Sequence, residues 1–380
     1  MSGAAPLPVA LFNTRFLPYS QTFVYEEIRL HQRYAAEVFC GVRMLPERFP
    51  WAPVFVGGPL YRVTRRSARF DARFRERGYA LVHAHFGPGA VYALPFARRH
   101  RLPLVVTFHG YDVPILASPR RWLPEHLRYA LLGPAVLREM TLGLCASGEL
   151  LELLAAQGVD RDRLRVHRLG IDVDAFRPGE RAAAPSQVVM VGRFVEKKGF
   201  EYGLRAFAAV AGEVPALRLT LIGEGDREPA LRAIVRGHGL EARVTFAGVL
   251  PPERVAAILA TAHVLLAPSV VEPGSGNRES GLIVVKEASA AGAVPIGTRH
   301  GGIPEIIDDG VTGYLVPERD AETLAARLRR VVTDPAHCAA LGAAAREKML
   351  REYDNRARVR ALEERYDEAR ARFGPGGRAP

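Results

Sequence analysis

The chain has 380 residues and a formal net charge of +11, with 48% hydrophobic and 24% charged residues, as is typical of globular proteins. This length exceeds the size at which one hydrophobic core usually stops growing, so we expect two domains of roughly 150 to 200 residues. No apolar run approaches the roughly 20 residues that span a bilayer, and the N-terminus does not resemble a signal peptide, which predicts a cytoplasmic protein.

Apolar runs alternate with helical segments in the first half, and this alternation predicts a parallel α/β sheet. The three cysteines are too few and too widely spaced for a disulfide framework or a zinc site, and we expect Cys40, Cys145 and Cys338 to be core residues. The predicted strands are Pro8–Asn13, Leu81–Phe86, Pro103–Gly110 and Leu142–Ser147.

The excess positive charge lies almost entirely in the first half. Residues 1–178 carry 24 Arg against 15 Asp and Glu, whereas residues 179–380 carry 28 basic and 26 acidic side chains. The arginine-rich stretch Arg62–Gly78 is suited to anionic lipid headgroups or a phosphorylated acceptor, and a solvated helix is an equally good interpretation. No nucleic-acid signature or aromatic stacking pattern accompanies it, so we expect no nucleic-acid partner.

A stretch rich in Pro, Gly and Ala, Phe176–Ser186, predicts a linker between the two halves. We therefore expect one domain over residues 1–178 and another over residues 179–353, with helical spacing in the tail over residues 354–373. The strands predicted in the second half are Gln187–Phe194, Leu217–Gly225, Arg243–Val249, His263–Ser269, Ala293–Thr298 and Gly313–Pro317.

Open parallel sheets bind ligands beyond the carboxyl ends of their strands, so the residues that follow each strand are candidates for a site. Arg193 follows the first strand of the second half, and Lys198 precedes a helical pattern. Together they can neutralise a diphosphate held at a helix N-terminus. Gly223 and Gly225 allow close backbone approach, but they do not form the GxGxxG pattern, which disfavours a nicotinamide-dependent enzyme.

Two acids, Glu279 and Glu287, flank a segment with the small and apolar residues of a packed helix. We expect Ser280 to cap this helix and to leave its first N–H groups open to a phosphate. Glu279 then lies on the preceding loop and Glu287 more than one turn into the helix. Carboxylates that accept sugar hydroxyls, with cations that bind a diphosphate, match the order of groups in a sugar nucleotide.

With these motifs assembled, the chain resembles the retaining glycosyltransferases of family four, which have the GT-B architecture. The resemblance rests on VGRFVEKKG, LIGEGDREPALR, the Glu-x7-Glu pair and GAVPIGTRHGGIPEIIDDGVTGYLVP in that order. The segment FLPYSQTF resembles the version in exopolysaccharide and colanic-acid-type enzymes. The implied fold is α/β, with two facing Rossmann-like domains, a cleft between them and a C-terminal helix that packs on the first domain.

The resemblance implies a hexosyltransferase that uses a nucleoside-diphosphate sugar and a saccharide, glycolipid or other acceptor in bacterial polysaccharide or glycoconjugate synthesis. It implies no cofactor and no metal, because the leaving diphosphate itself helps to accept the acceptor's proton. Peripheral contact with the inner face of an anionic membrane is consistent with the basic first half. The implied catalytic residues are His109, Arg193, Lys198 and Glu279, those on the donor are Gly223, Gly225, Val249, Gly281, Leu282, Ile283 and Glu287, and those on the acceptor side are Ser20, Gln21, Thr22 and Asp112.

Other interpretations remain open at this stage. Asp172 and Asp174 mimic an Asp-x-Asp metal motif, but their place at the domain junction favours a turn. His83 and His85 are of the type that binds zinc, but no third ligand lies nearby in sequence. A sugar-nucleotide epimerase of GT-B fold would need no acceptor, and a noncatalytic nucleotide-binding subunit would release no nucleoside diphosphate from a donor.

Overall fold

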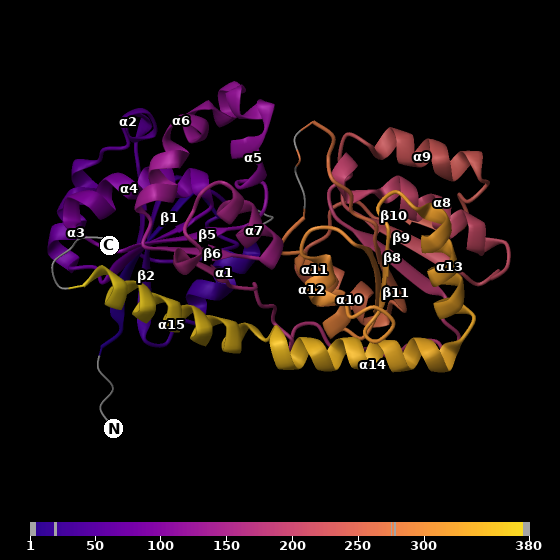
Figure 1. Cartoon of the computed structure of the whole chain (residues 1–380). Helices are drawn as coiled ribbons and strands as arrows, with labels where there is room; N and C mark the ends of the chain where they lie inside the picture. Colours follow the sequence, from indigo (N-terminus) through magenta and orange to yellow (C-terminus); the bar gives the residue numbers. More distant parts are fainter. Residues whose placement is uncertain (1–4, 19–20, 275, 277–278, 375–380) are drawn as a thin grey trace. The chain divides into compact units, whose positions relative to one another are not determined.

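The chain folds into two compact units in a computed structural model that describes residues 5–18, 21–274, 276 and 279–374 (Figure 1). Unit 1 comprises Met1–Gly170 and Asn355–Pro380, and unit 2 comprises Ile171–Asp354. The division falls before the stretch that the sequence predicts to be a linker. That stretch packs on unit 2 instead, because Phe176 is buried there and the Gly179 N–H donates to the carbonyl of Ala260.

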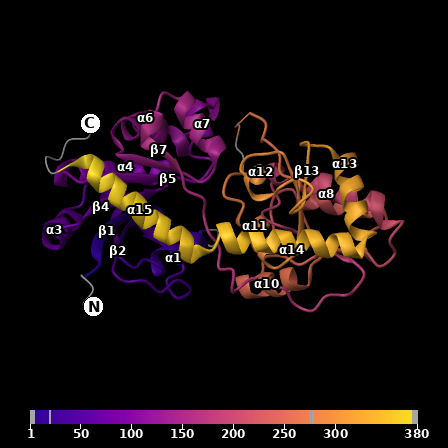
Figure 2. The same ribbon diagram turned by 60° about the horizontal axis from the view of Figure 1, so that its bottom comes forward.

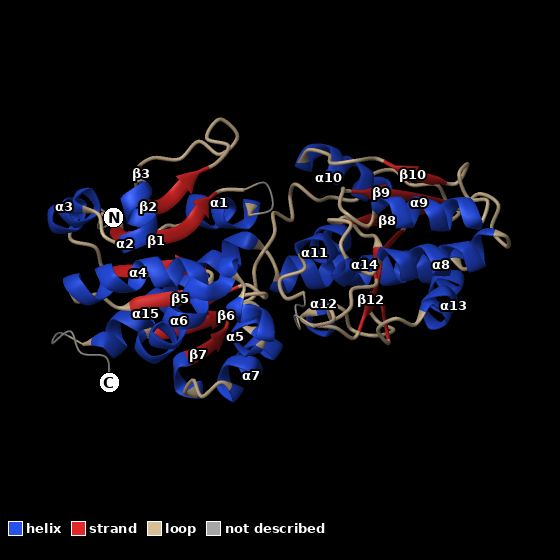
Figure 3. Cartoon of the chain, turned by 90° about the horizontal axis from the view of Figure 1, so that it is seen from above, coloured by secondary structure: helices blue, strands red, loops and turns tan. Residues whose placement is uncertain are grey.

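Unit 1 is built on a seven-stranded parallel sheet with the order β3-β2-β1-β4-β5-β6-β7 (Figure 3). Parallel strands need crossover connections, and helices provide most of them. The strands are β1 (Leu7–Phe16), β2 (Tyr34–Arg43), β3 (Val54–Val56), β4 (Leu81–His85), β5 (Leu104–Phe108), β6 (Leu142–Cys145) and β7 (Leu164–Val166). The helices are α1 (Thr22–Arg29), α2 (Pro59–Thr64), α3 (Ala68–Arg77), α4 (Gly87–His100), α5 (Pro114–Ala117), α6 (Pro124–Glu139), α7 (Gly148–Ala156) and α15 (Asn355–Phe373), with 3-10 turns η1 (Pro119–Trp122) and η2 (Arg161–Arg163).

The C-terminal helix α15 packs on the sheet of unit 1, as the sequence comparison with GT-B proteins implies. Figure 2 shows α15 running across the sheet, on the face that it shares with α1. Leu362, Tyr366 and Ala369 are buried against Val9 and other strand residues. The opposite face of the sheet is covered by α4.

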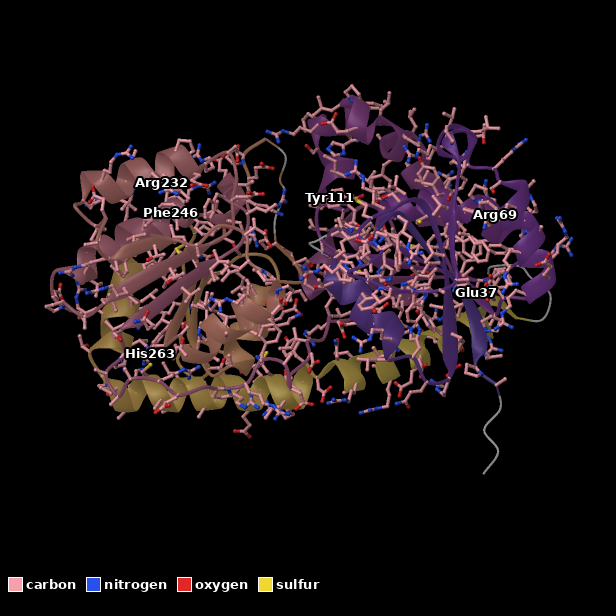
Figure 4. All side chains as sticks on the ribbon, turned by 180° about the vertical axis from the view of Figure 1, so that it is seen from behind. Glu37, Arg69, Tyr111, Arg232, Phe246 and His263 are labelled. Atoms are coloured by element: carbon pink, nitrogen blue, oxygen red, sulfur yellow. The ribbon has the colours of Figure 1, made fainter. Side chains whose placement is uncertain are left out.

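The sequence did not predict β2, β3 or β7. In β2 the apolar pattern is interrupted by Glu37, which is only 5% exposed and accepts hydrogen bonds from Arg73 at 2.8 Å and Arg77 at 2.9 Å. Arg69, labelled with Glu37 in Figure 4, lies together with Arg73 over the ring of Phe55. Part of the arginine-rich stretch is therefore committed to internal contacts.

Unit 2 contains a six-stranded parallel sheet with the order β10-β9-β8-β11-β12-β13. Its strands are β8 (Gln187–Val191), β9 (Arg218–Ile222), β10 (Val244–Phe246), β11 (Val264–Ala267), β12 (Val294–Thr298) and β13 (Tyr314–Val316). Its helices are α8 (Phe200–Ala211), α9 (Glu228–Gly237), α10 (Pro252–Thr261), α11 (Ile283–Ala290), α12 (Ile303–Ile306), α13 (Ala321–Val332) and α14 (Pro335–Glu352), with a 3-10 turn η3 (Glu196–Lys198).

Both faces of this second sheet are buried, which explains why its strands are almost continuously apolar. Val188 and Met190 of β8 point into the cluster under α8 and α13, whereas Val189 points into the cluster under α11 and α14. Figure 4 also shows Arg232 of α9 beside Phe246 of β10, and the guanidinium carbon lies 4.1 Å from the ring centroid. Over the described residues, no helix has the length and apolar character to cross a bilayer.

Candidate functional site

The carboxyl ends of β8 and β11 form the place in unit 2 where a ligand site is expected. These strands are neighbours, and the connections that leave them lead to opposite sides of the sheet, to β9 and to β12. Such a topological switch point is where open α/β sheets bind ligands. The loop after β8 carries Arg193 and Lys198, and the loop after β11 leads to Glu279.

Lys198 and Glu279, two of the residues predicted from sequence, are in direct contact. Lys198 Nζ lies 3.0 Å from Glu279 Oε2, and Lys197 Nζ lies 3.1 Å from Glu279 Oε1. Burial raises the pKa of Glu279, but attraction to Lys198 and Lys197 outweighs it and lowers the pKa to about 2. The carboxylate is therefore ionised at any pH used for an assay. Lys197 was not predicted, although the Lys-Lys dipeptide offered the signal.

A hydrogen-bonded chain from β12 fixes the backbone of Glu279. The Glu279 N–H donates to His300 Nε2 at 2.9 Å, so that nitrogen is unprotonated. His300 Nδ1 then donates to Glu318 Oε1 at 2.8 Å, and the other oxygen of Glu318 accepts from the Val271 N–H at 2.8 Å. Sequence reasoning missed His300 and Glu318, because only the tertiary fold brings them beside Glu279.

Arg193 and Glu287 do not join this ion-pair cluster. Arg193 is exposed, and its side chain forms no ion pair with any residue that the structure describes. Glu287 lies on α11, and its carboxyl accepts no hydrogen bond from the described residues. Burial raises the pKa of Glu287 to about 7, against a smaller lowering effect of Lys286. Both side chains are therefore available to a ligand.

Helix α11 begins later than the sequence predicts, and the expected cap at Ser280 is wrong. The helix begins at Ile283, and its N-cap is Leu282, with φ 34° and ψ 56°. The Leu282 position provides no side-chain hydrogen bond to cap the first turn. This left-handed conformation costs a residue with a side chain roughly 1–2 kcal/mol. Leu282 is only 5% exposed, so its burial in the apolar cluster under α11 holds it there. The adjacent Gly281 is partly exposed.

The glycines that follow β9 bring two loops into backbone contact. A Cβ atom on Gly223, which has φ 134°, would lie 2.0 Å from the carbonyl oxygen of Gly192. A Cβ on Gly225 would lie 2.4 Å from the carbonyl oxygen of Phe194. The close approach predicted for these glycines is therefore made to the chain's own loop after β8. Val249, on the loop after β10, is 51% exposed.

In unit 1, His109 follows β5 and is held by aromatic and histidine neighbours. Its ring centroid lies 4.9 Å from that of Phe23 and 4.4 Å from that of Phe86. His109 Nε2 lies 3.0 Å from His85 Nδ1, and His85 Nε2 lies 3.2 Å from Glu27 Oε1. Burial, followed by the proximity of His85, holds the pKa of His109 well below its ordinary value. The His109 ring is therefore neutral.

Asp112 is used by the backbone around His109. It is fully buried, and it accepts hydrogen bonds from the N–H groups of Gly110 at 2.9 Å, His109 at 3.2 Å and Gly87 at 3.0 Å. Burial raises its pKa to about 6, although these backbone hydrogen bonds oppose the rise. Asp112 ties the end of β5 to the start of α4, and its role toward an acceptor stays a prediction.

The other residues predicted on the acceptor side lie at the start of α1. Gln21 occupies the N-cap position and accepts a hydrogen bond from Asn13 Nδ2 at 3.0 Å. Thr22 is the first residue of the helix, and both residues are partly exposed. Ser20 lies outside the described residues. No contact tests the acceptor role of these three residues.

The structure supplies a third potential metal ligand beside His83 and His85, namely Glu27 of α1, with donor atoms within 4.8 Å of one another. Both nitrogens of His83 are already used, however. Nδ1 bonds Tyr366 OH at 2.8 Å, and Nε2 bonds Thr107 Oγ1 at 2.8 Å. This donor set does not fit a metal without the loss of those bonds.

The predicted turn at the unit boundary is present. Asp172 Oδ1 accepts from the N–H groups of Asp174 at 2.9 Å and Ala175 at 3.0 Å. Asp174 Oδ1 pairs with Arg177. These contacts explain both acids of the Asp-x-Asp pattern as parts of a turn.

Comparison with known proteins shows that each half of the chain matches a glycosyltransferase family model. Residues 26–175 match the family described as Glycosyltransferase Family 4, and residues 174–348 match Glycosyl transferases group 1. In Salmonella typhimurium, a protein named as a colanic acid biosynthesis glycosyltransferase, WcaL, is 30% identical over 73% of this chain and 68% of its own length. The Escherichia coli protein of the same name is 32% identical over 64% of this chain and 59% of its own length.

Among solved structures, Anabaena HepE in complex with UDP superposes with a TM-score of 0.77. The superposition covers 96% of this chain and 100% of HepE at 19% identity, which shows a shared fold. The two Rossmann-like units predicted from sequence are thereby confirmed. The chain belongs to the group 1 and family 4 glycosyltransferases.

Proposed function

We propose that the protein transfers a hexose from a nucleoside-diphosphate sugar to a saccharide or glycolipid acceptor, with retention of the anomeric configuration. One observation carries the proposal: Lys197, Lys198 and Glu279 meet at the carboxyl ends of β8 and β11. The cations suit a diphosphate and the acid suits sugar hydroxyls. The UDP complex of HepE and the names of the WcaL relatives support a nucleotide donor and a role in polysaccharide synthesis.

The proposed roles in unit 2 follow the chemistry of each group. Arg193 and Lys198 neutralise the charge that develops on the leaving diphosphate, which also approaches the uncapped first turn of α11. Glu279 accepts hydroxyl groups of the transferred sugar, and Glu287 accepts those of the ribose. The leaving phosphate oxygen takes the proton of the attacking acceptor hydroxyl, so no protein base is needed. In unit 1, His109 binds a substrate hydroxyl.

The test is sugar transfer from radiolabelled nucleotide sugars by Glu279→Gln and Arg193→Ala. Removing one group that stabilises the transition state costs about 10²- to 10³-fold in rate. Glu228→Gln and Arg299→Ala are matched controls, because both residues are on the surface in exposed or partly exposed ion pairs. Full activity of both site variants, with unchanged unfolding temperature, would remove these residues from the mechanism.

The same assay separates this proposal from its rivals. An epimerase would convert the donor sugar without an acceptor, and a noncatalytic subunit would bind the nucleoside diphosphate but release none from any donor. We propose that no metal is required, because cationic side chains take its place. Transfer should therefore persist in chelator; a complete loss that manganese restores would contradict this part of the proposal.

We further propose that unit 1 contacts an anionic membrane through α2, η1 and α6. These elements carry several exposed apolar residues, and the exposed fraction of each residue lies between 39% and 72%. Arg128 links α6 to α2 and α4, because it bonds both the Arg62 carbonyl and Tyr92 OH. Arginines beside apolar side chains suit anionic headgroups. The apolar residues are Leu60, Val63, Trp122, Leu123, Leu127 and Leu131.

Sedimentation with vesicles of phosphatidylglycerol tests this surface. Leu131→Glu with Val63→Glu should lower binding by about tenfold or more, because each buried apolar side chain contributes about 1.5 kcal/mol or more. Val311→Glu with Leu350→Glu is the control, since these exposed apolar residues belong to unit 2. Equal binding by the two double variants would rule out the proposed surface.

A further inference from the structure

A buried row of polar groups leads from α1 to His109. Glu27 of α1 and His85 of β4 are 5% and 0% exposed, and the ring of His85 lies beside that of His83, which bonds Tyr366 of α15. His85 precedes His109 in the row: the two rings are stacked at 5.2 Å with an interplanar angle of 19°, and their nitrogens lie 3.0 Å apart. The mechanism proposed above gives no role to Glu27 or His85.

The charge of Glu27 decides where the protons in this row lie. Burial raises the pKa of Glu27, but attraction and hydrogen bonding to His85 outweigh it, so the pKa is lowered and the carboxyl is ionised. His85 Nε2 lies 3.2 Å from Glu27 Oε1, although the two are not aligned as an ideal hydrogen bond. An unprotonated Nε2 would direct its lone pair at a carboxylate. Nε2 therefore carries a proton, and in a His85 ring that holds a single proton Nδ1 is an acceptor.

The proton position on His85 determines the direction of the hydrogen bond between His85 and His109. Because His85 Nδ1 accepts, the nitrogen that faces it at 3.0 Å, His109 Nε2, must donate. A neutral His109 with its proton on Nε2 has an unprotonated Nδ1. That atom is buried and has no hydrogen-bond partner among the residues that the structure describes. It is a vacant acceptor for a hydroxyl donor.

We propose that Glu27 and His85 are positioning residues that hold His109 in the Nε2–H tautomer, so that its Nδ1 accepts a hydrogen bond from a substrate hydroxyl. This inference rests on the proposed transferase function for its consequence, but the tautomer itself does not. The arrangement is a carboxylate–histidine pair, which in other proteins fixes both the tautomer and the orientation of a functional ring. Here the pair is Glu27 and His85, and the ring whose tautomer it fixes is that of a second histidine, His109.

The other histidines near the row do not set the positions of the protons on His85 and His109. His83 is engaged by Tyr366 and Thr107, at 2.8 Å each, on both of its nitrogens. Burial lowers the pKa of His31, and burial lowers the pKa of His167 to about 4, so both rings are neutral. Glu27 is therefore the group whose charge orients the row.

Nitrogen-15 NMR of the full chain with labelled histidine tests the tautomer without any substrate. The resonances of His109 are identified by their absence in His109→Asn. We expect an unprotonated Nδ1 and a protonated Nε2 in the native protein and in Glu27→Asp, which keeps the carboxylate. Glu27→Gln should populate the Nδ1–H form. A native His109 protonated at Nδ1, or a spectrum unchanged in Glu27→Gln, would overturn the proposal.

Kinetics then test the consequence. Glu27→Gln should lower kcat by about 10- to 100-fold, the size of effect that follows when a metal-binding histidine loses the group that orients it. Its affinity for UDP should be unchanged, because the row lies in unit 1. Glu37→Gln is the matched control, being another buried glutamate of unit 1 that contacts arginines instead of histidines. The expected tautomer in a protein that transfers no sugar would refute only the proposed function, whereas normal kcat in Glu27→Gln would refute the positioning role.

Discussion

At the scale of single residues, the two glutamates of unit 2 differ because their surroundings differ. Attraction to Lys198 and Lys197 outweighs burial at Glu279 and lowers its pKa to about 2, whereas at Glu287 burial outweighs the effect of Lys286 and raises the pKa to about 7. The folded state therefore gains stability from Glu279 that is lost as pH falls through about 2. For Glu287 the sign is opposite, and stability falls as pH rises from about 4.5 to about 7.

The raised pKa of Glu287 predicts pH-dependent nucleotide binding. Ribose hydroxyls donate to the ionised carboxylate, so UDP affinity should increase as pH rises through about 7, by up to about tenfold per pH unit below that value. Calorimetric titration of UDP against the native protein and Glu287→Gln measures this. Titration of the ligand's own phosphate affects both proteins equally. Parallel pH profiles would show that Glu287 does not bind the ligand through its ionised form.

At the scale of elements, the site in unit 2 depends on loops that touch through their backbones. The Gly223 N–H donates to the carbonyl of Gly248, and the Gly192 N–H donates to that of Ile222, so the loops after β8, β9 and β10 hold one another. Lys198 is positioned by the first of these loops. A change in their contact should therefore alter both stability and ligand binding.

Gly223→Ala tests that dependence. The new Cβ would meet the Gly192 carbonyl at 2.0 Å, in a backbone conformation that side chains rarely adopt, and we expect a loss of about 2 kcal/mol or more. Gly212→Ala is the control, because Gly212 ends α8 with φ −66° and nothing lies within 4 Å of the added atom. Urea unfolding measures both variants. Equal unfolding midpoints would contradict the backbone contact.

Apolar runs made most strands predictable, including all the strands of unit 2. The strand β2 was missed because Glu37 looks like a surface residue in sequence and is buried only with its arginine partners. Lys198 and Glu279 were predictable as residues that follow strands. The Glu27–His85 contact and the His300–Glu318 chain join residues from different elements, and no local pattern encodes them. The left-handed conformation of Leu282 was likewise not predictable from local sequence, because burial in the cluster under α11 holds it.

At the scale of the whole molecule, the chain enters unit 2 after Gly170 and returns to unit 1 at Asn355. The returning helix α15 supplies Leu362 and Tyr366 to the core of unit 1, and Glu363 accepts hydrogen bonds from the N–H groups of Gln32 and Arg33. Unit 1 is therefore made of two separate stretches, and unit 2 of a single one.

Deletion of residues 355–380 should destabilise unit 1 and leave unit 2 folded. The loss of several buried side chains, at about 1.5–3 kcal/mol each, is comparable with the whole stability of a typical domain. Hydrogen exchange followed by mass spectrometry should show lost protection in β1, β4 and β5 but not in β8, β9 and β11. Leu350→Ala on α14 is the control, since this side chain is 46% exposed. Retained protection in β4 would contradict the contribution of α15.

The place of α15 in the chain also sets an order of events during synthesis on the ribosome. Unit 2 is complete as soon as its own residues have emerged, and it is able to fold while the tail is still being translated. The sheet of unit 1 is made before unit 2, yet its apolar surface around Val9 and Leu81 stays uncovered until α15 has emerged. Unit 1 is thus begun before unit 2 and completed after it, and its nascent form exposes apolar surface in the interval.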